Sequence, residues 1–167
     1  MKKMALFILA LSFCFSASQA KESVAGKSEA SARQQLPYAV DQSVESFSQT
    51  VHGGIMHITA KSAGDTQQIK RIQQYLRKTA EEFKKGDFSS TERFHGPDMP
   101  GLAQMKAAKP DDIRYEYKAL SNGGQIHFST EYPQLLNAIH AWIDAQIAEH
   151  GNTVLPGHEG HHASPAE

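Results

Sequence analysis

Residues 52–60 read HGGIMHITA, and residues 122–130 read NGGQIHFST. Each stretch places a glycine pair shortly before an apolar residue, a histidine and a second apolar residue. Aligning Gly53 with Gly123 brings His57 onto His127, at a sequence offset of 70. Self-similarity of this kind is typical of a duplicated structural unit. The repeat therefore predicts that the core of this chain consists of two copies of one structural unit.

The alignment continues into two amphipathic helices once the following loop is shortened by three residues. At the resulting offset of 67, Ile69 meets Leu136 and Leu76 meets Ile143. Apolar residues recur at helical spacing in both segments, which predicts helices over 66–85 and 133–150 that stop at the glycines after them. The apolar stripes are Ile69, Ile72, Leu76, Ala80 and Phe83 in the first helix, and Leu136, Ile139, Ile143 and Ile147 in the second.

Each glycine pair is preceded by a segment that can be extended. ESFSQTV at 45–51 precedes the first pair and IRYEYKAL at 113–120 the second. Asn122-Gly123 indicates a hairpin in the second copy, since both residues tolerate positive φ. The segment at 45–51 in the first copy also fits the spacing of a helix. We expect an α+β fold of two ββα units: a four-stranded, mostly antiparallel sheet with the two main helices on one face.

Residues 1–20 have the pattern of a signal peptide. Two lysines precede an apolar run, and small residues at Ser18 and Ala20 fit a cleavage site. Cleavage after Ala20 predicts a periplasmic or secreted protein without a stable membrane anchor. The remaining chain is expected to comprise a disordered arm at 21–36, a single domain at 37–151 and a flexible His-rich tail at 152–167.

Composition excludes several classes of function. Cys14 is the only cysteine and lies within the predicted signal, so neither disulfides nor thiolate chemistry are expected after cleavage. The sequence carries 17 basic and 18 acidic residues and no basic stripe interleaved with aromatics. Nucleic acid is therefore not an expected partner.

His57 and His127 form an equivalent pair on the two repeated strands. Strand alternation predicts that their apolar neighbours face the helices and that both imidazoles lie on the opposite face. One interpretation is a pair that binds a metal or titrates between pH 5 and 8. The other is two strand residues that are solvated or packed in a dimer.

The segment between the two copies contains His95 and a predicted short helix at 100–108. His95 lies before Gly96-Pro97 in a stretch rich in turn formers, where the sequence predicts an ordered loop. Binding residues are often carried on such loops. The alternative is an imidazole that caps or packs on the loop.

The second helix carries its own group of polar residues. His140 is predicted at the edge of the apolar stripe, with Asp144 one turn further as a carboxylate that orients it, or as a plain surface partner. His150 is placed to interact with the helix dipole. Trp142 is predicted to lie away from the centre of the stripe and to cover a sheet edge or a partner.

Histidine is the main candidate ligand type in this chain. Imidazoles suit copper, zinc and nickel, and three of them occur within five positions of the tail. These tail imidazoles must lose their protons to bind, so we expect their binding to weaken below about pH 6.5. The candidate metal ligands are His52, His95, His140 and His150 in the domain and His158, His161 and His162 in the tail.

TVHGGIMHI, the stretch from IKRIQQYL to HGPDMPGL, and AIHAWIDAQIAEHG together resemble a small family of exported bacterial proteins with no established biochemical role. Some of its members carry the label aspartate carbamoyltransferase. The resemblance spans about 50–151. It implies a set of marker residues: His52, Gly53, Gly54, Gly86, Asp87, Phe88, His95, Gly96, Pro100, Gly101, His140, Trp142, His150 and Gly151.

The residues themselves favour two other classes over an enzyme. A carbamoyltransferase must hold a phosphate dianion and a dicarboxylate, which requires Arg-rich loops. The chain has five arginines and no Ser-Thr-Arg-Thr loop. The first class is a periplasmic domain that binds copper or zinc. The second is a metal-free module that forms a homodimer or binds a periplasmic partner protein.

Overall fold

A computed structural model describes residues 36–151. A 3-10 turn, η1 (Val40–Gln42), leads into β1 (Ser43–Thr50), β2 (Gly53–Ala60) and α2 (Thr66–Lys84). The short helices α3 (Ser89–His95) and α4 (Leu102–Ala107) connect this first unit to the second. That unit comprises β3 (Arg114–Leu120), β4 (Gly123–Ser129) and α5 (Pro133–His150). Within the described range, no helix combines the length and apolar character needed to cross a membrane.

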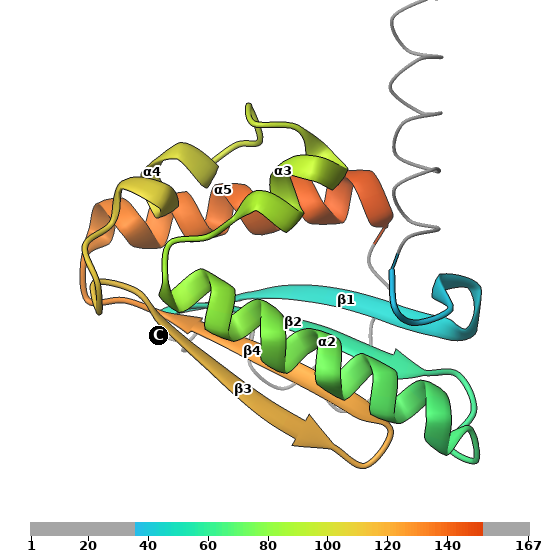
Figure 1. The fold of residues 1–167 in the computed structure, drawn as a ribbon. Coiled ribbons are helices and arrows are strands. Elements are labelled where there is room, and N and C mark those ends of the chain that lie inside the picture. The colour runs from blue at the N-terminus through green and yellow to red at the C-terminus, as the bar shows by residue number, and fades with distance from the viewer. Residues whose placement is uncertain (1–35, 152–167) are drawn as a thin grey trace, which may run out of the picture.

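The predicted fold class is confirmed. The four strands form one sheet in the order β1-β2-β4-β3, and every neighbouring pair is antiparallel. α2 packs on β2, β3 and β4, and α5 packs on β1 and β2, so each helix covers a different half of the sheet (Figure 1). The segment at 45–51 is a strand and not a helix, as the ββα interpretation requires.

Strand registers carry the duplication into three dimensions. Phe47 faces Met56 across the first hairpin, and Tyr117 faces Ile126 across the second, at the same offset of 70. Met56 and Ile126 also face each other where β2 and β4 pair. A pseudo-twofold axis therefore passes between these two residues at the centre of the sheet.

The repeated glycine pair is explained by close approach at equivalent places. A Cβ on Gly53 would overlap the carbonyl oxygen of Phe128, and a Cβ on Gly123 would overlap that of Ile58. The second glycine of each pair lies under a helix, with Gly54 against Ile143. The first glycine thus lets the central strands pair, and the second lets the helix pack on them.

The hairpin turn differs from the expectation for Asn122-Gly123. The two turn residues are Ser121 and Asn122, and Gly123 already pairs with Leu120. Asp111 is the only non-glycine in the described range with positive φ, so neither turn residue has the predicted left-handed backbone. The glycine is required by its contact with β2 and not by the turn.

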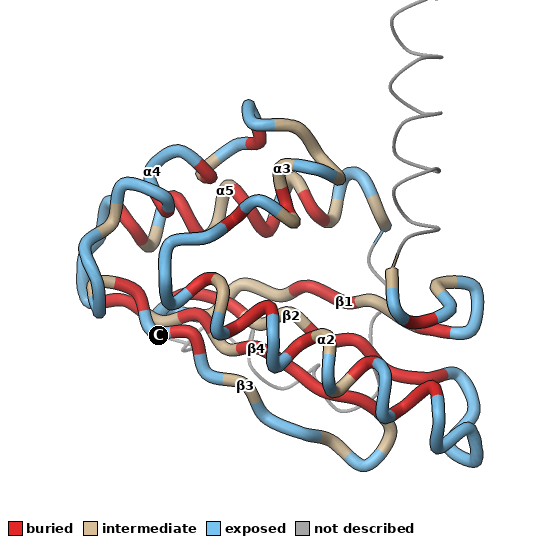
Figure 2. Tube along the Cα trace, in the orientation of Figure 1, coloured by how far each residue is buried: buried red, intermediate tan, exposed pale blue. Residues whose placement is uncertain are grey.

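Both main helices cover the core, but in α5 the buried residue of the first turn is Leu135 and not the predicted Leu136, and the buried face is wider than predicted. Ile72 and Leu76 of α2, and Ile139 and Ile143 of α5, are fully buried. Figure 2 shows buried residues along the sheet side of α2 and over much of α5. The wider burial follows because α4 packs on the side of α5 that faces away from the sheet.

Trp142 belongs to this wider buried face, which corrects the prediction that it covers an edge or a partner. Its side chain is buried, with its ring centroid 5.3 Å from that of Phe128 and 6.1 Å from that of Phe47. Gly101, at the start of α4, has a φ of 76° and lies against the backbone of Ala138 in α5. The Trp142 ring therefore lies in the core between α5, α2 and the sheet, and the start of α4 covers the backbone of α5 beside it.

Candidate metal centre

Two helix ends bring three potential metal ligands together. α3 ends at His95, and α5 ends with Glu149 and His150. The ligand atoms of these side chains all lie within 4.8 Å of one another. In residues 36–151 no other group of three histidine, cysteine or carboxylate side chains meets this condition.

The position of His95 depends on a helix where a loop was predicted. Phe88 is buried and stacks on Phe83 with ring centroids 4.6 Å apart, which anchors the start of α3. The Asp87 carboxylate accepts a hydrogen bond from the Ser89 backbone N–H at 3.0 Å, a contact typical of helix starts. The stretch from Asp87 to Glu92 therefore contained a helix signal that the prediction of a loop overlooked.

A hydrogen bond joins the two helix ends. Nδ1 of His95 contacts Oε2 of Glu149 at short hydrogen-bond distance. The His95 side chain is only 8% exposed and that of Glu149 is 37% exposed, so the contact is partly shielded from water. Nδ1 donates to the carboxylate, which fixes the orientation of the His95 ring, and Nδ1 must lose this proton before it can bind a metal.

His150 completes the group with an unsatisfied nitrogen. Its ring stacks on Phe47, with centroids 6.2 Å apart and an interplanar angle of 24°, and lies edge-on to His95 at 5.0 Å. Nδ1 of His150 is buried and makes no hydrogen bond within the described residues. A buried nitrogen without a partner loses the hydrogen bond it would make in water, which costs about 1–3 kcal/mol.

Two imidazoles and one carboxylate are a donor set suited to divalent transition metals. Zinc sites with two histidines and one glutamate keep a fourth position open for water or substrate. Metal–ligand bonds of about 2.0–2.2 Å require donor atoms closer together than 4.8 Å. Binding therefore requires small side-chain rotations and displacement of the proton shared by His95 and Glu149.

A small cavity of about 50 Å³ adjoins the two imidazoles, both of which line it. This volume is sufficient for a water molecule. Glu45 and Gln146 offer polar atoms in its wall, and the Tyr38 hydroxyl donates to Oε1 of Glu45 at 2.8 Å. Met56 contributes a thioether on the same wall, a donor type that suits copper(I). The group thus adjoins a water-sized cavity whose wall is mainly apolar, with a few polar atoms.

His140 lies outside the group and has a structural partner. Its Nε2 donates to the carbonyl oxygen of Thr50 at 3.0 Å. Gln73, its counterpart at the offset of 67, donates to the carbonyl oxygen of Leu120 at 2.9 Å. Thr50 and Leu120 are themselves related by the offset of 70 and end equivalent strands. His140 therefore ties α5 to the sheet as a glutamine ties α2.

Asp144 does not orient His140 in this structure. Its Oδ1 accepts from Nε2 of Gln49 at 2.7 Å. Both α5 residues thus contact β1, but they do so through separate hydrogen bonds. The orienting carboxylate predicted for Asp144 is replaced by Glu149, which contacts His95.

His52 also has a repeat counterpart, Asn122. The backbone carbonyl of His52 accepts from Thr130 N–H at 2.9 Å, and that of Asn122 accepts from Ala60 N–H at 2.8 Å. These equivalent bonds join each turn to the other copy, and the His52 side chain is exposed. His140 and His150 are ten residues apart on one helix, or about 15 Å, so the four predicted domain ligands do not form one site.

His57 and His127 lie on the sheet face away from the helices, as predicted, and are bridged by one amide. Gln125 faces His57 across the β2–β4 pair, and its Oε1 contacts Nε2 of His57. Nε2 of Gln125 contacts Nε2 of His127. His57 is only 3% exposed, so it is not the solvated strand residue of one prediction. The Gln125 side chain thus accepts a hydrogen bond from the His57 ring and donates one to the His127 ring.

Glu149 was missed because the sequence argument paired side chains by helical spacing. Its partner His95 lies 54 residues away on another helix, and only the position of α3 brings them together. The adjacent dipeptide Glu149-His150 at the helix end was the available signal.

His158, His161 and His162 lie outside the described residues. No family model, no curated protein and no solved structure matches this chain.

Proposed function

We propose that this chain is an exported domain that binds one copper or zinc ion through His95, Glu149 and His150. The observation that carries the proposal is the buried Nδ1 of His150, which has no hydrogen-bond partner in the described residues and lies beside an imidazole–carboxylate pair. We propose that a metal ion binds the His150 ring, one ligand atom of which lies within 4.8 Å of those of His95 and Glu149. The ion would also neutralise the carboxylate in a partly shielded site.

Comparison of the two copies supports a specific role for His150. At the offset of 67, its counterpart in α2 is Phe83, a buried residue of the aromatic core. A phenylalanine in place of His150 would keep the stacking on Phe47 and would leave no nitrogen unsatisfied. An apolar side chain can therefore pack at this position, so packing alone does not explain why it is a histidine.

The proposed role is to hold and exchange an ion, since three protein donors leave an open position. Glu149 is partly exposed, so an ion can enter and leave without unfolding the domain. The tail histidines begin eight residues after His150 and form a second candidate binding group. We propose that they deliver ions to the domain or buffer them, in the compartment to which the predicted signal directs the chain.

The central experiment compares His150→Phe with His140→Gln, each replacing a histidine by the residue of the other copy. Zinc(II) and copper(II) are titrated by calorimetry into both variants and the parent protein. We expect His150→Phe to weaken the domain site at least about tenfold and His140→Gln to leave it unchanged. Binding should release a proton, so the observed heat should depend on the ionisation enthalpy of the buffer.

Equal affinity of His150→Phe and the parent protein would overturn the site. Truncation after Pro156 tests the tail separately. We expect it to remove the weaker binding events and to retain the domain event. If the truncated chain keeps every event, the tail has no metal role. A metal-free protein that co-purifies from the periplasm with a single partner would favour the interaction module instead.

A further inference from the structure

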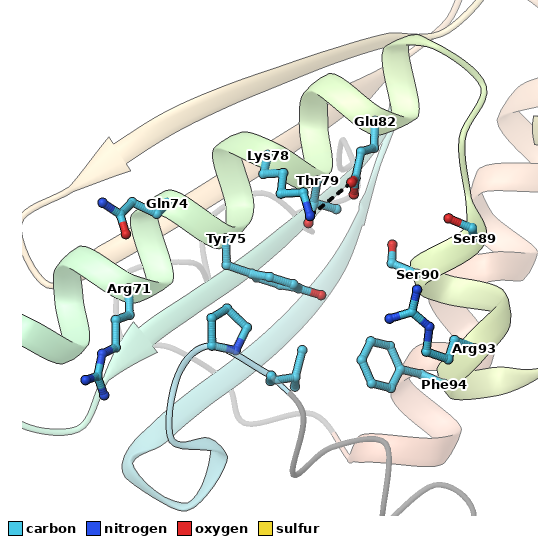
Figure 3. Close-up of a pocket in the computed structure, with 12 residues that line it drawn as sticks. Arg71, Gln74, Tyr75, Lys78, Thr79, Glu82, Ser89, Ser90, Arg93 and Phe94 are labelled. Carbon is cyan, nitrogen blue, oxygen red and sulfur yellow. Dashed lines mark ion pairs between the residues drawn. The ribbon is translucent and has the colours of Figure 1, made fainter.

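A cleft separate from the metal ligands lies between α2 and α3. It has a volume of about 380 Å³ and is closed on a third side by Leu36 and Pro37. Figure 3 shows Tyr75 extending from α2 across the cleft towards Ser90 and Arg93 of α3. Small-molecule sites typically measure about 300–1,000 Å³, so the cleft is large enough for a small organic ligand.

The floor of the cleft combines an apolar surface with hydroxyl groups. Tyr75 and Phe94 contribute aromatic rings, and Tyr38 supports Tyr75 from behind with ring centroids 5.2 Å apart. Burial raises the pKa of Tyr75 to about 12, so its hydroxyl keeps its proton at neutral pH. Ser89 and Ser90 add hydroxyls on the opposite wall. The surface suits a flat apolar body with polar groups at its rim.

The charge of the cleft is positive. Arg71 lines it from α2 and Arg93 from α3, and no ion pair joins either residue to another described side chain. The third cation, Lys78, is paired with Glu82 at 3.4 Å (Figure 3). Since Glu82 is the only acidic residue in the described lining, two guanidinium charges remain uncompensated.

We propose that this cleft binds a small organic anion, with its acidic group on Arg93 and its apolar body on Tyr75 and Phe94. Arg71 adds positive charge at the other end of the cleft (Figure 3). A guanidinium presents a planar fork of donors that matches a carboxylate, which favours an organic acid over a neutral ligand of the same shape. The binding site uses none of the three proposed metal ligands. It is therefore a second site on the domain, next to the first, because Leu36, Tyr75 and Phe94 line both this cleft and the cavity beside the two imidazoles.

The test uses 2-naphthoate as the probe and 2-naphthamide as its uncharged counterpart. Each is titrated into the purified exported protein in the presence of a chelator, with binding followed by calorimetry and by amide chemical shifts. We expect saturable 1:1 binding of 2-naphthoate, shifts centred on α3 and the facing side of α2, and at least about tenfold weaker binding of 2-naphthamide.

Two double variants separate the cleft from the net charge of the protein. Arg71→Glu/Arg93→Glu reverses both cleft arginines, and Arg77→Glu/Arg114→Glu makes the same charge change outside the cleft lining. We expect at least about tenfold loss of 2-naphthoate affinity in the first and less than about twofold in the second. Arg93→Gln, a milder change at an exposed residue, should also weaken binding while the far-ultraviolet circular dichroism stays that of the parent.

Absence of saturable 2-naphthoate binding would overturn the proposal. Equal losses in the two double variants would do the same, because they would reduce the effect to net charge. Equal affinity for the acid and the amide would show that the arginines do not select an anion. Each of these outcomes leaves the metal site untouched, since the titration is carried out without free metal.

Discussion

The two ββα units share one scaffold but differ in what surrounds their helices. Their hairpins keep the same register, and their helices begin at Thr66 and Pro133, which are related by the offset of 67. α4 packs on the outer side of α5, and α3 reaches the C-terminal end of α5, whereas charged residues such as Lys70 on the outer side of α2 are exposed. The three proposed metal ligands lie where this symmetry ends.

This difference gives a way to separate scaffold histidines from candidate ligands. His140 and His52 make contacts that Gln73 and Asn122 reproduce in the other copy. Such residues serve the sheet and its helices. His150 occupies the position that the buried Phe83 has in the other copy, and His95 belongs to the connecting segment between the copies. Function is therefore expected where a residue has no counterpart with the same role.

The largest effects should follow from the first glycine of each pair. Gly53→Ala and Gly123→Ala each force a methyl group into the backbone of the other central strand, so we expect each to lower the free energy of unfolding by roughly 4 kcal/mol. Urea denaturation of both variants measures the loss. A large loss in one variant and none in the other would break the equivalence of the copies.

Equivalent core positions should give the next largest effects. Leu76 and Ile143 are fully buried and occupy equivalent positions in the two helices, so Leu76→Ala and Ile143→Ala should each cost about 3 kcal/mol through lost burial and a cavity. Ile143→Ala relieves the contact with Gly54, and a Gly54→Ala/Ile143→Ala double variant should cost less than the sum of its parts. Strict additivity would argue against that contact.

Tyr75 of α2 should contribute to the sensitivity of the fold to alkaline pH, as Tyr115 and Tyr117 of β3 should in the other copy, since burial raises the pKa of all three. Tyr75 corresponds to Trp142, and burial raises the pKa of Tyr75 to about 12 from its ordinary value near 10. A raised folded-state pKa gives stability that is present below pH 10 and is lost as pH rises towards 12. Tyr75→Phe should remove roughly 2 kcal/mol of this loss, measured by denaturation at pH 9 and pH 11.5. An identical pH dependence in the variant would contradict this account of its environment.

The smallest effects concern the two side chains that tie the helices to strand ends. Gln73→Ala and His140→Ala should each cost about 1 kcal/mol, the usual contribution of one hydrogen bond. His140→Gln should recover most of that loss because it restores the contact of the other copy. Thermal denaturation can detect the difference. If glutamine fails to replace the histidine, His140 has a role that the repeat does not explain.

Periodicity was sufficient to predict the elements that are repeated. The offsets of 70 and 67 located four strands and two long helices, because each unit must bury the same kind of apolar face. Comparison of the repeats could not predict α3, which has no counterpart in the other copy, or the wider buried face of α5, which depends on how α4 packs on it. The site has the same origin: His95 and Glu149 meet across two helix ends with no local signal between them.

The pseudo-twofold axis between Met56 and Ile126 has a consequence for how this protein can change. An assembly of two identical ββα chains around such an axis would carry every substitution twice, once in each half. Joining both halves in one chain removes that constraint, as the pair Phe83 and His150 illustrates. One half can keep the residue that packs best, while the other half can carry a residue with a different chemical role at the same structural position.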